Sequence, residues 1–246
     1  MFYDTTGKEL NWNYFLSYYE PYYFLSSKSD ASVIVKNKTS PFIEKEIEKI
    51  LVRGLNKNDI IFIIAWKLGY IKQSESEESK QIEFQREFNI RLIDRYNNNF
   101  TEMVKYLNVN FDRLSKLAQF KQYEELFSNL CINRVSGFGA TYIINLMFFF
   151  SKGELPIYDA YVSCALNALC NKYKPDKTCV VKITNIPQLY NGHQDHICKA
   201  WNFYQNYIKE LKAISGSDYV TRTMDRALWV YGHCFKKQGT SGQCRY

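Results

Sequence analysis

Hydrophobic positions in the first third of the chain recur at helical spacing, and capping residues mark the ends of two segments. The first, residues 39–54, reads TSPFIEKEIEKILVRG, with Ser40 as a cap, Pro41 at the first position and Gly54 as the stop. The second, residues 58–69, reads NDIIFIIAWKLG and is apolar on almost every side. We therefore predict two helices here, the second deeply buried.

Helical periodicity continues through most of the remaining chain, whereas the alternation typical of strands is nearly absent. Further helices are predicted at 84–95, 101–107, 111–131, about 159–172, 194–213 and 218–236. The segment CVVKI at 179–183 is the one short strand candidate, and the polar run KQSESEESKQ at 72–81 is typical of a solvated loop. The predicted fold class is all-α.

Composition adds an aromatic excess and a mild positive charge. The 246 residues include 20 Tyr, 17 Phe and 4 Trp, and the formal net charge is +7. Such a charge is compatible with an anionic partner without requiring one. The seven cysteines form no C-x-x-C pair, the start MFYDTTGKEL is unlike a signal peptide, and the longest apolar run is too short to span a membrane. We expect a cytoplasmic protein with reduced thiols and no membrane partner.

The segment INRVSGFGATYIINL, residues 132–146, places a glycine-rich turn directly before an apolar helix. Gly137 and Gly139 flank Phe138, and glycines allow a positive φ that exposes N–H groups at the helix start. Such an N-terminus attracts phosphate, while Phe138 would insert between the flanking helices and fix their angle. This is the layout of a helix-hairpin-helix, which contacts the DNA backbone. A tight connection without a ligand is the alternative interpretation.

The turn and the segment after it resemble the helix-hairpin-helix DNA glycosylase superfamily. In that superfamily the hairpin reads roughly L-P-G-V-G-x-x-T-A, and a catalytic aspartate follows in a segment like V-P-V-D-T-H. This chain reads VSGFGATYI and then LPIYDAYV, with Asp159 20 residues after Gly139. The resemblance covers about residues 123–170. PIYDAYV and DRALWVYGH (225–233) also resemble bacterial proteins with an 8-oxoguanine-glycosylase fold.

The resemblance implies two helical lobes with a DNA-binding cleft between them. One lobe would be 82–190, with the hairpin at about 123–152, and the other would combine 1–81 and 191–246. We expect a monomer that binds double-stranded DNA. The residues that would contact the DNA are those of the hairpin: Ser136, Gly137, Phe138, Gly139, Ala140 and Thr141.

Asp159 is the catalytic residue that the resemblance implies. Breaking an N-glycosidic bond builds positive charge on the sugar, which a fixed carboxylate stabilises while it activates water. The flipped base needs a pocket, for which Tyr161, Asp225 and Trp229 are candidates. In the alternative interpretation, Asp159 caps the helix that begins AYVSCAL, and the aromatic residues are core. Both roles of Asp159 can coexist.

Thr141 occupies the position at which bifunctional members of the superfamily carry a lysine that attacks the sugar. A hydroxyl cannot form an imine, so base excision without strand cleavage is expected. The cysteine spacing does not fit an iron–sulfur cluster. His193, His196 and Cys198 lack the spacing of a zinc site, so we expect neither metal nor cofactor.

The function expected from the sequence is therefore a monofunctional DNA glycosylase that acts on a damaged or modified base by base flipping. Oxidised guanine is the first substrate candidate, which would make the role DNA repair. A bulky modified base of the kind that phages carry is the second, which would make the role phage defence. The alternative is a DNA-binding module without catalysis. The helix with Arg222 and Arg226 offers a basic edge that either meets DNA or is merely solvated.

Overall fold

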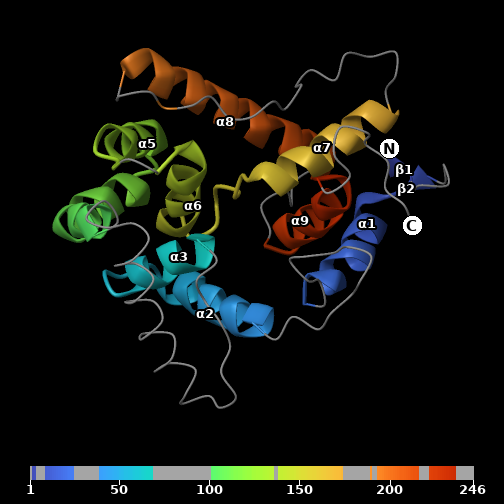
Figure 1. Cartoon of the computed structure of the whole chain (residues 1–246), viewed down its shortest axis with the longest axis horizontal. Coiled ribbons are helices and arrows are strands. Elements are labelled where there is room, and N and C mark those ends of the chain that lie inside the picture. The colour runs from blue at the N-terminus through green and yellow to red at the C-terminus, as the bar shows by residue number, and fades with distance from the viewer. Residues whose placement is uncertain are drawn as a thin grey trace. The chain divides into compact units, whose positions relative to one another are not determined.

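Helices dominate the part of the chain that the computed structural model describes, namely residues 2–3, 9–24, 39–68, 101–135, 138–173, 189, 193–215 and 222–236 (Figure 1). The strands found among these residues are β1 (Phe2–Tyr3) and β2 (Glu9–Leu10), which pair antiparallel. The all-α prediction is therefore confirmed for this part. The predicted loop at 72–81, the helix at 84–95 and the strand candidate at 179–183 lie outside the described residues.

The chain divides into two compact units, each assembled from separate segments. Unit 1 combines Met1–Asn37, Pro156–Ile186 and Asn202–Tyr246. Unit 2 combines Lys38–Leu155 and Pro187–Trp201. These divisions differ from the expected lobes, 82–190 against 1–81 and 191–246. The hairpin and Asp159, which we expected in one lobe, belong to different units.

Unit 2 contains most of the helices predicted in the first two thirds of the chain. They are α2 (Thr39–Arg53), α3 (Asp59–Leu68), the helical residues 101–119, α5 (Tyr123–Ile132), α6 (Ala140–Phe150) and the start of α8 (Gln194–Ser215). The apolar helix α6 contacts both α5 and α3. Nine of its residues are buried, so its side chains form the centre of this unit's core.

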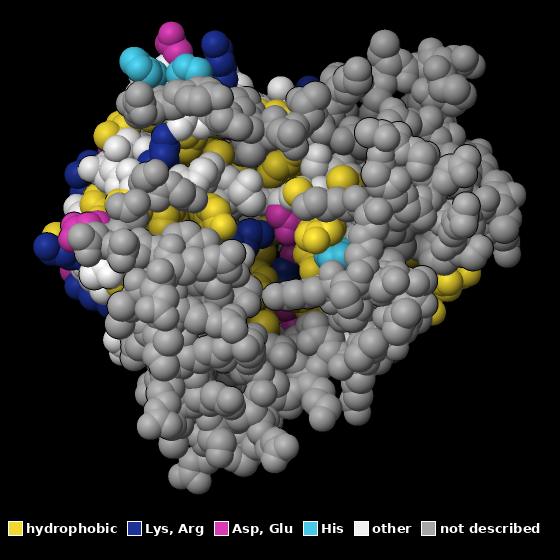
Figure 2. Space-filling view, in the orientation of Figure 1, with side chains coloured by type: hydrophobic (Ala, Val, Ile, Leu, Met, Phe, Trp, Pro, Cys, Tyr) yellow, Lys and Arg dark blue, Asp and Glu magenta, His cyan; other side chains and the backbone are white. Residues whose placement is uncertain are grey.

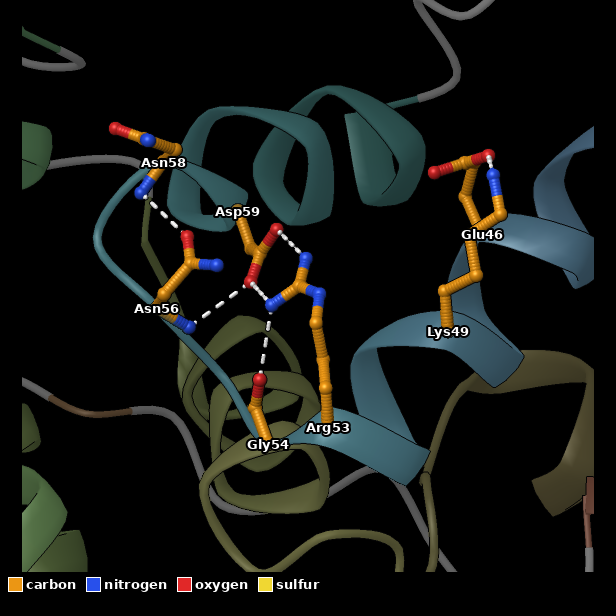
Figure 3. Close-up of polar contacts among 7 residues, drawn as sticks. All are labelled: Glu46, Lys49, Arg53, Gly54, Asn56, Asn58 and Asp59. Atoms are coloured by element: carbon orange, nitrogen blue, oxygen red, sulfur yellow. Dashed lines mark hydrogen bonds and ion pairs between the residues drawn. The ribbon is translucent and has the colours of Figure 1, made fainter.

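The turn between α2 and α3 is closed by an ion pair (Figure 3). Arg53 donates two hydrogen bonds to the carboxylate of Asp59, of 2.8 and 2.5 Å. Asp59 also accepts a hydrogen bond from the backbone N–H of Asn56 at 2.9 Å. Asp59 is only 8% exposed, so its carboxylate depends on these partners. Gly54 ends α2 as predicted and takes φ +88°, a conformation that glycine adopts without strain. Asp59 therefore links the end of α2 and the loop after it to the start of α3.

The predicted helix at 111–131 is wrong in its continuity, because the chain turns at Lys121. The N–H groups of Lys121 and Gln122 donate to the carbonyl oxygens of Ala118 and Leu117, which is a Schellman motif. Lys121 takes φ +55° in the position that glycine usually fills. The sequence lacked the glycine that signals such an end, so one long helix was predicted where two are present.

Unit 1 is built around the C-terminal helix α9 (Arg222–Lys236). This helix contacts α7 (Ala160–Tyr173), α1 (Trp12–Tyr19) and the 3-10 helix η1 (Glu20–Phe24). Tyr231 of α9 meets Phe15 and Tyr19 of α1 edge-on, with ring centroids 5.3 and 4.8 Å apart. Aromatic rings thus join the two ends of the chain within this unit. The predicted helices at 159–172, 194–213 and 218–236 are confirmed as α7, α8 and α9.

Helices α7 and α9 approach closely at Gly232. A Cβ atom placed on Gly232 would overlap the carbonyl oxygen of Tyr161. The absence of a side chain at Gly232 therefore sets the distance between the two backbones.

None of the helices in the described part of the chain combines the length and the hydrophobicity that a membrane span needs.

Candidate functional site

Asp159 lies directly before the first turn of α7, in unit 1. Its Oδ1 atom accepts hydrogen bonds from the backbone N–H groups of Tyr161 and Val162, at 2.9 and 3.0 Å. This is the geometry of an N-cap, which satisfies two amides that have no acceptor within the helix. The aspartate residue is partly exposed. The capping role anticipated for Asp159 is therefore present, and the same bonds fix the direction of its carboxylate.

The loop before Asp159 is anchored by two tyrosine hydroxyl groups from α8. Tyr204 donates to the carbonyl oxygen of Pro156 and Tyr207 donates to that of Ile157, both at 2.6 Å. The ring of Tyr158 packs edge-on against Tyr207, with centroids 5.0 Å apart. The backbone that leads into Asp159 is thus held at consecutive residues.

Aromatic rings gather beside the start of α7. Tyr161 stacks on His233 of α9, with centroids 3.5 Å apart and an interplanar angle of 9°. Trp229 lies 5.5 Å from the Tyr161 ring and 5.3 Å from that of Tyr23. Two residues predicted for the base pocket, Tyr161 and Trp229, are thus brought together, and both keep part of their surface exposed. The same contacts fit the alternative in which these rings are core.

The third pocket candidate, Asp225, is engaged by a neighbouring arginine. Arg222 forms a hydrogen-bonded ion pair with Asp225, which is 8% exposed. Arg226 pairs with Glu20 at 2.5 Å, and its side chain is 16% exposed. Both arginines are therefore mostly buried partners of carboxylates within unit 1. The sequence interpretation of a solvated or DNA-facing basic edge is not supported, because each charge is neutralised inside the unit.

Burial governs the ionisation of the tyrosines around Asp159. Desolvation raises the pKa of Tyr158 to about 12, with a smaller contribution from the charge of Asp159. Desolvation and then the Asp159 charge also raise the pKa of Tyr161. Burial, followed by the charges of Asp225 and Asp159 among others, raises the pKa of Tyr207 well above its ordinary value. These hydroxyl groups therefore stay protonated at neutral pH and can act as donors.

The glycine-rich turn joins α5 to α6 in unit 2, and these two helices contact each other. Phe138 is 3% exposed and its ring lies 5.4 Å from that of Tyr142, so the expected burial of this side chain is confirmed. The N–H of Phe138 donates to the carbonyl of Val135 at 3.1 Å. Ser136 and Gly137, also predicted to contact DNA, lie outside the described residues.

Gly139 corrects one expectation about the turn. Its φ is −75° and its ψ is 177°, so the backbone is extended rather than left-handed. A Cβ atom here would meet nothing within 4 Å. Gly139 is the N-cap of α6 and offers no side-chain acceptor to the amides of Ala140 and Thr141. The start of α6 is therefore uncapped by its own N-cap residue, next to open space, as an anion-binding helix start would be.

Arg134 is a residue of the α5–α6 connection that the sequence interpretation missed. Its Nη2 donates to the carbonyl of Leu189, and its buried Nε has no hydrogen-bond partner among the described residues. Arginine is the commonest bidentate ligand of phosphate in proteins, so a cation in this connection suits the expected partner. The signal in the sequence was an arginine three residues before Gly137.

His193 and His196 lie where α8 begins, with ring centroids 6.1 Å apart. Figure 2 shows histidine side chains together with acidic and basic ones at this end of α8. The carbonyl of His193 accepts from the N–H of His196 at 3.0 Å, as in the first turn of a helix. Among the residues that the structure describes, no group of three or more His, Cys, Asp or Glu could hold a metal ion.

Tyr204 and Tyr207 were also missed, although both lie on the predicted helix at 194–213. They belong to its buried stripe with Ile197, Ala200, Ile208 and Leu211. The helical spacing of these residues indicates burial, but it says nothing about which carbonyl a hydroxyl group reaches.

No family model matches the chain, and neither a curated protein nor a solved structure is significantly similar to it. We therefore infer its function from its own residues and from the resemblance of its two motifs.

Proposed function

We propose that this protein is a monofunctional DNA glycosylase, which hydrolyses the N-glycosidic bond of a damaged or modified base flipped out of the duplex. The observation that carries the proposal is the setting of Asp159. Its partly exposed carboxylate is fixed through Oδ1 by two amides, at the end of a loop anchored by two tyrosines. A carboxylate held in this way is preorganised to stabilise charge that develops near it.

In this mechanism the bond between C1′ and the base nitrogen breaks, and its electron pair leaves with the base. The sugar becomes cationic, and the Asp159 carboxylate stabilises that charge. The same carboxylate accepts a proton from the water whose oxygen bonds to C1′. Asp159 therefore supplies the chemistry from unit 1.

The turn before α6 supplies the grip on DNA from unit 2. The amides at the start of α6, which Gly139 leaves without a side-chain acceptor, offer N–H donors to a phosphate, and the arginine at position 134 adds a positive charge to the same connection. These contacts are to the backbone, so they would be independent of sequence. The duplex would thus be held by main-chain donors.

The test is base release from duplexes that carry 8-oxoguanine, other oxidised bases or glucosylated hydroxymethylcytosine, scored as abasic sites after alkali. We expect release from at least one duplex, and we expect Asp159→Asn to abolish it while DNA affinity changes by less than about threefold. Asn retains a capping oxygen, so the fold is kept while the charge is lost. Undiminished release by this variant would remove Asp159 from the mechanism.

A DNA-binding module without catalysis is the second candidate. The capping bonds of Asp159 favour it, because they give this residue a structural role that needs no chemistry. DNA binding with no release from any duplex would support this candidate.

A further inference from the structure

Helix α8 holds the loop that delivers Asp159 through the hydroxyl groups of Tyr204 and Tyr207. These donate to the carbonyl oxygens of Pro156 and Ile157, at 2.6 Å each. We infer that Tyr204 and Tyr207 are positioning residues, which hold the Asp159 carboxylate where the sugar cation forms. This inference rests on the proposed function, because it assigns them a part in the same reaction.

Burial makes these two hydrogen bonds matter for the position of the loop. Tyr204 and Tyr207 are 0% and 1% exposed, and Pro156 and Ile157 are buried as well. A buried carbonyl oxygen that loses its donor retains the cost of desolvation without a compensating bond. Removal of the hydroxyl groups would therefore favour a shift of the loop toward water or toward other donors.

The remaining residue of the loop, Tyr158, is held from the side. Its ring meets Tyr207 at 5.0 Å and Phe203 at 5.3 Å, both edge-on. Tyr158 immediately precedes Asp159, whose carboxylate is fixed on its other side by the first amides of α7. The chain is thus anchored on both sides of the carboxylate, and α8 supplies the anchors that precede it.

The ionisation of Tyr207 is consistent with a permanent donor. Burial and the negative charges of Asp225 and Asp159 raise its pKa well above the ordinary value, so the hydroxyl group keeps its proton throughout the neutral range. A neutral donor adds no charge of its own beside the loop.

The experiment compares a Tyr204→Phe, Tyr207→Phe double variant with the wild type on whichever duplex the wild type processes. A displacement of about 1 Å in a catalytic group can slow a reaction by roughly a hundredfold, so we expect single-turnover base release to fall by about ten- to a hundredfold. We expect DNA affinity to stay within about twofold, because the grip on DNA belongs to unit 2. Tyr106→Phe is the control for the loss of a tyrosine hydroxyl away from the loop, since this partly buried tyrosine of unit 2 donates to the carbonyl of Asn129 at 3.3 Å.

Hydrogen exchange supplies a readout that needs no activity. The amides of Tyr161 and Val162 donate to the Asp159 carboxylate, so their exchange reports whether that carboxylate is still held. In the double variant we expect these two amides to exchange faster by a larger factor than amides in the middle of α9. A uniform increase in both places would indicate only a loss of stability and would overturn the inference. If the double variant does not fold, the single variant Tyr207→Phe is measured in the same way.

The outcomes separate this inference from the proposed function. Slower release with selectively faster exchange supports the inference, and unchanged release by a well-folded variant overturns it. If the wild type releases no base from any duplex, the proposed function fails. In that case hydrogen exchange in the double variant is the only test. A selective increase at Tyr161 and Val162 would support the anchoring of Asp159 by α8, and unchanged exchange at these amides would contradict it.

Discussion

At the residue scale, Asp159 combines a structural bond with a charge, and substitutions can separate the two. Its oxygen caps α7, a role that asparagine also fills and alanine does not. We expect Asp159→Ala to lower the free energy of unfolding by about 1 kcal/mol, and Asp159→Asn to change it by less than about half as much. Denaturant titration of both variants measures the difference. Equal stability of the two variants would contradict the capping role.

At Gly139, substitutions can separate helix stability from DNA binding, because the structure leaves open space where a side chain would lie. Its extended backbone is the conformation that N-cap residues use, so Gly139→Asp should cap α6 and raise stability by up to about 1 kcal/mol. The new carboxylate would occupy the amides proposed to bind phosphate and would repel it. We expect DNA affinity to fall roughly tenfold or more, independently of sequence.

The control for this variant is Gly139→Ala, which adds a methyl group and no acceptor. It should reduce affinity less than the aspartate does. If Gly139→Asp binds DNA as tightly as the wild type, the start of α6 is not the phosphate site.

The sequence identified several of these residues but not their partners. Phe138 was predicted to be buried from its place between two glycines, and a cap was the alternative interpretation of Asp159 from its place before a helix. The targets of Tyr204 and Tyr207, and the pairing of Arg226 with Glu20, depend on contacts between segments far apart in the chain. Local spacing carries no information about such contacts.

At the scale of elements, the close contact between α7 and α9 depends on one missing side chain. We expect Gly232→Ala to lower the free energy of unfolding by about 3 kcal/mol or more, because its methyl group would overlap the Tyr161 carbonyl and force the helices apart. Thermal unfolding measures the loss. A Gly232→Ala protein as stable as the wild type would contradict the close contact.

The sequence predicts the end of a helix where a glycine takes the left-handed position, but not where a lysine takes it. Gly54 ends α2 as expected, whereas Lys121 and Lys152 take φ values of 55° and 53° at turns after helices. Lysine rarely adopts this conformation, so no residue in the sequence signals the turn at Lys121. Helix α1 was not predicted, although the sequence places an N-cap residue, Asn11, directly before it. In the structure the side chain of Asn11 accepts a hydrogen bond from the N–H of Tyr14 at 2.7 Å.

At the scale of the whole molecule, the division into units was the least predictable feature. The expected boundaries were taken from the polar run at 72–81 and from the two-lobe arrangement that the resemblance implies. The units instead follow packing, because α3 contacts α6 in unit 2 and α7 contacts α9 in unit 1. Only the three-dimensional structure reveals which distant segments share a core.

Two lysines of the described residues, Lys152 and Lys199, could be considered as substitutes for the missing amine nucleophile. Thr141 stands where the resemblance implies a lysine, and Lys152 and Lys199 are both exposed. An amine nucleophile is usually activated by burial or by a neighbouring positive charge. We therefore expect base release without strand cleavage, and no covalent adduct when borohydride is added during the reaction. Efficient trapping that disappears in Lys152→Ala or Lys199→Ala would identify a nucleophile and overturn the monofunctional assignment.

The packing of α1 and η1 on α9 has a consequence for synthesis on the ribosome. Phe15 and Tyr19 leave the exit tunnel long before Tyr231, the residue they meet in the finished protein. At roughly 5–20 residues per second, that interval lasts on the order of 10 to 40 seconds. During this time Phe15 and Tyr19 of the nascent chain lack Tyr231 as a partner, so a chaperone can bind these exposed rings. Unit 1 can close only after α9 has left the exit tunnel.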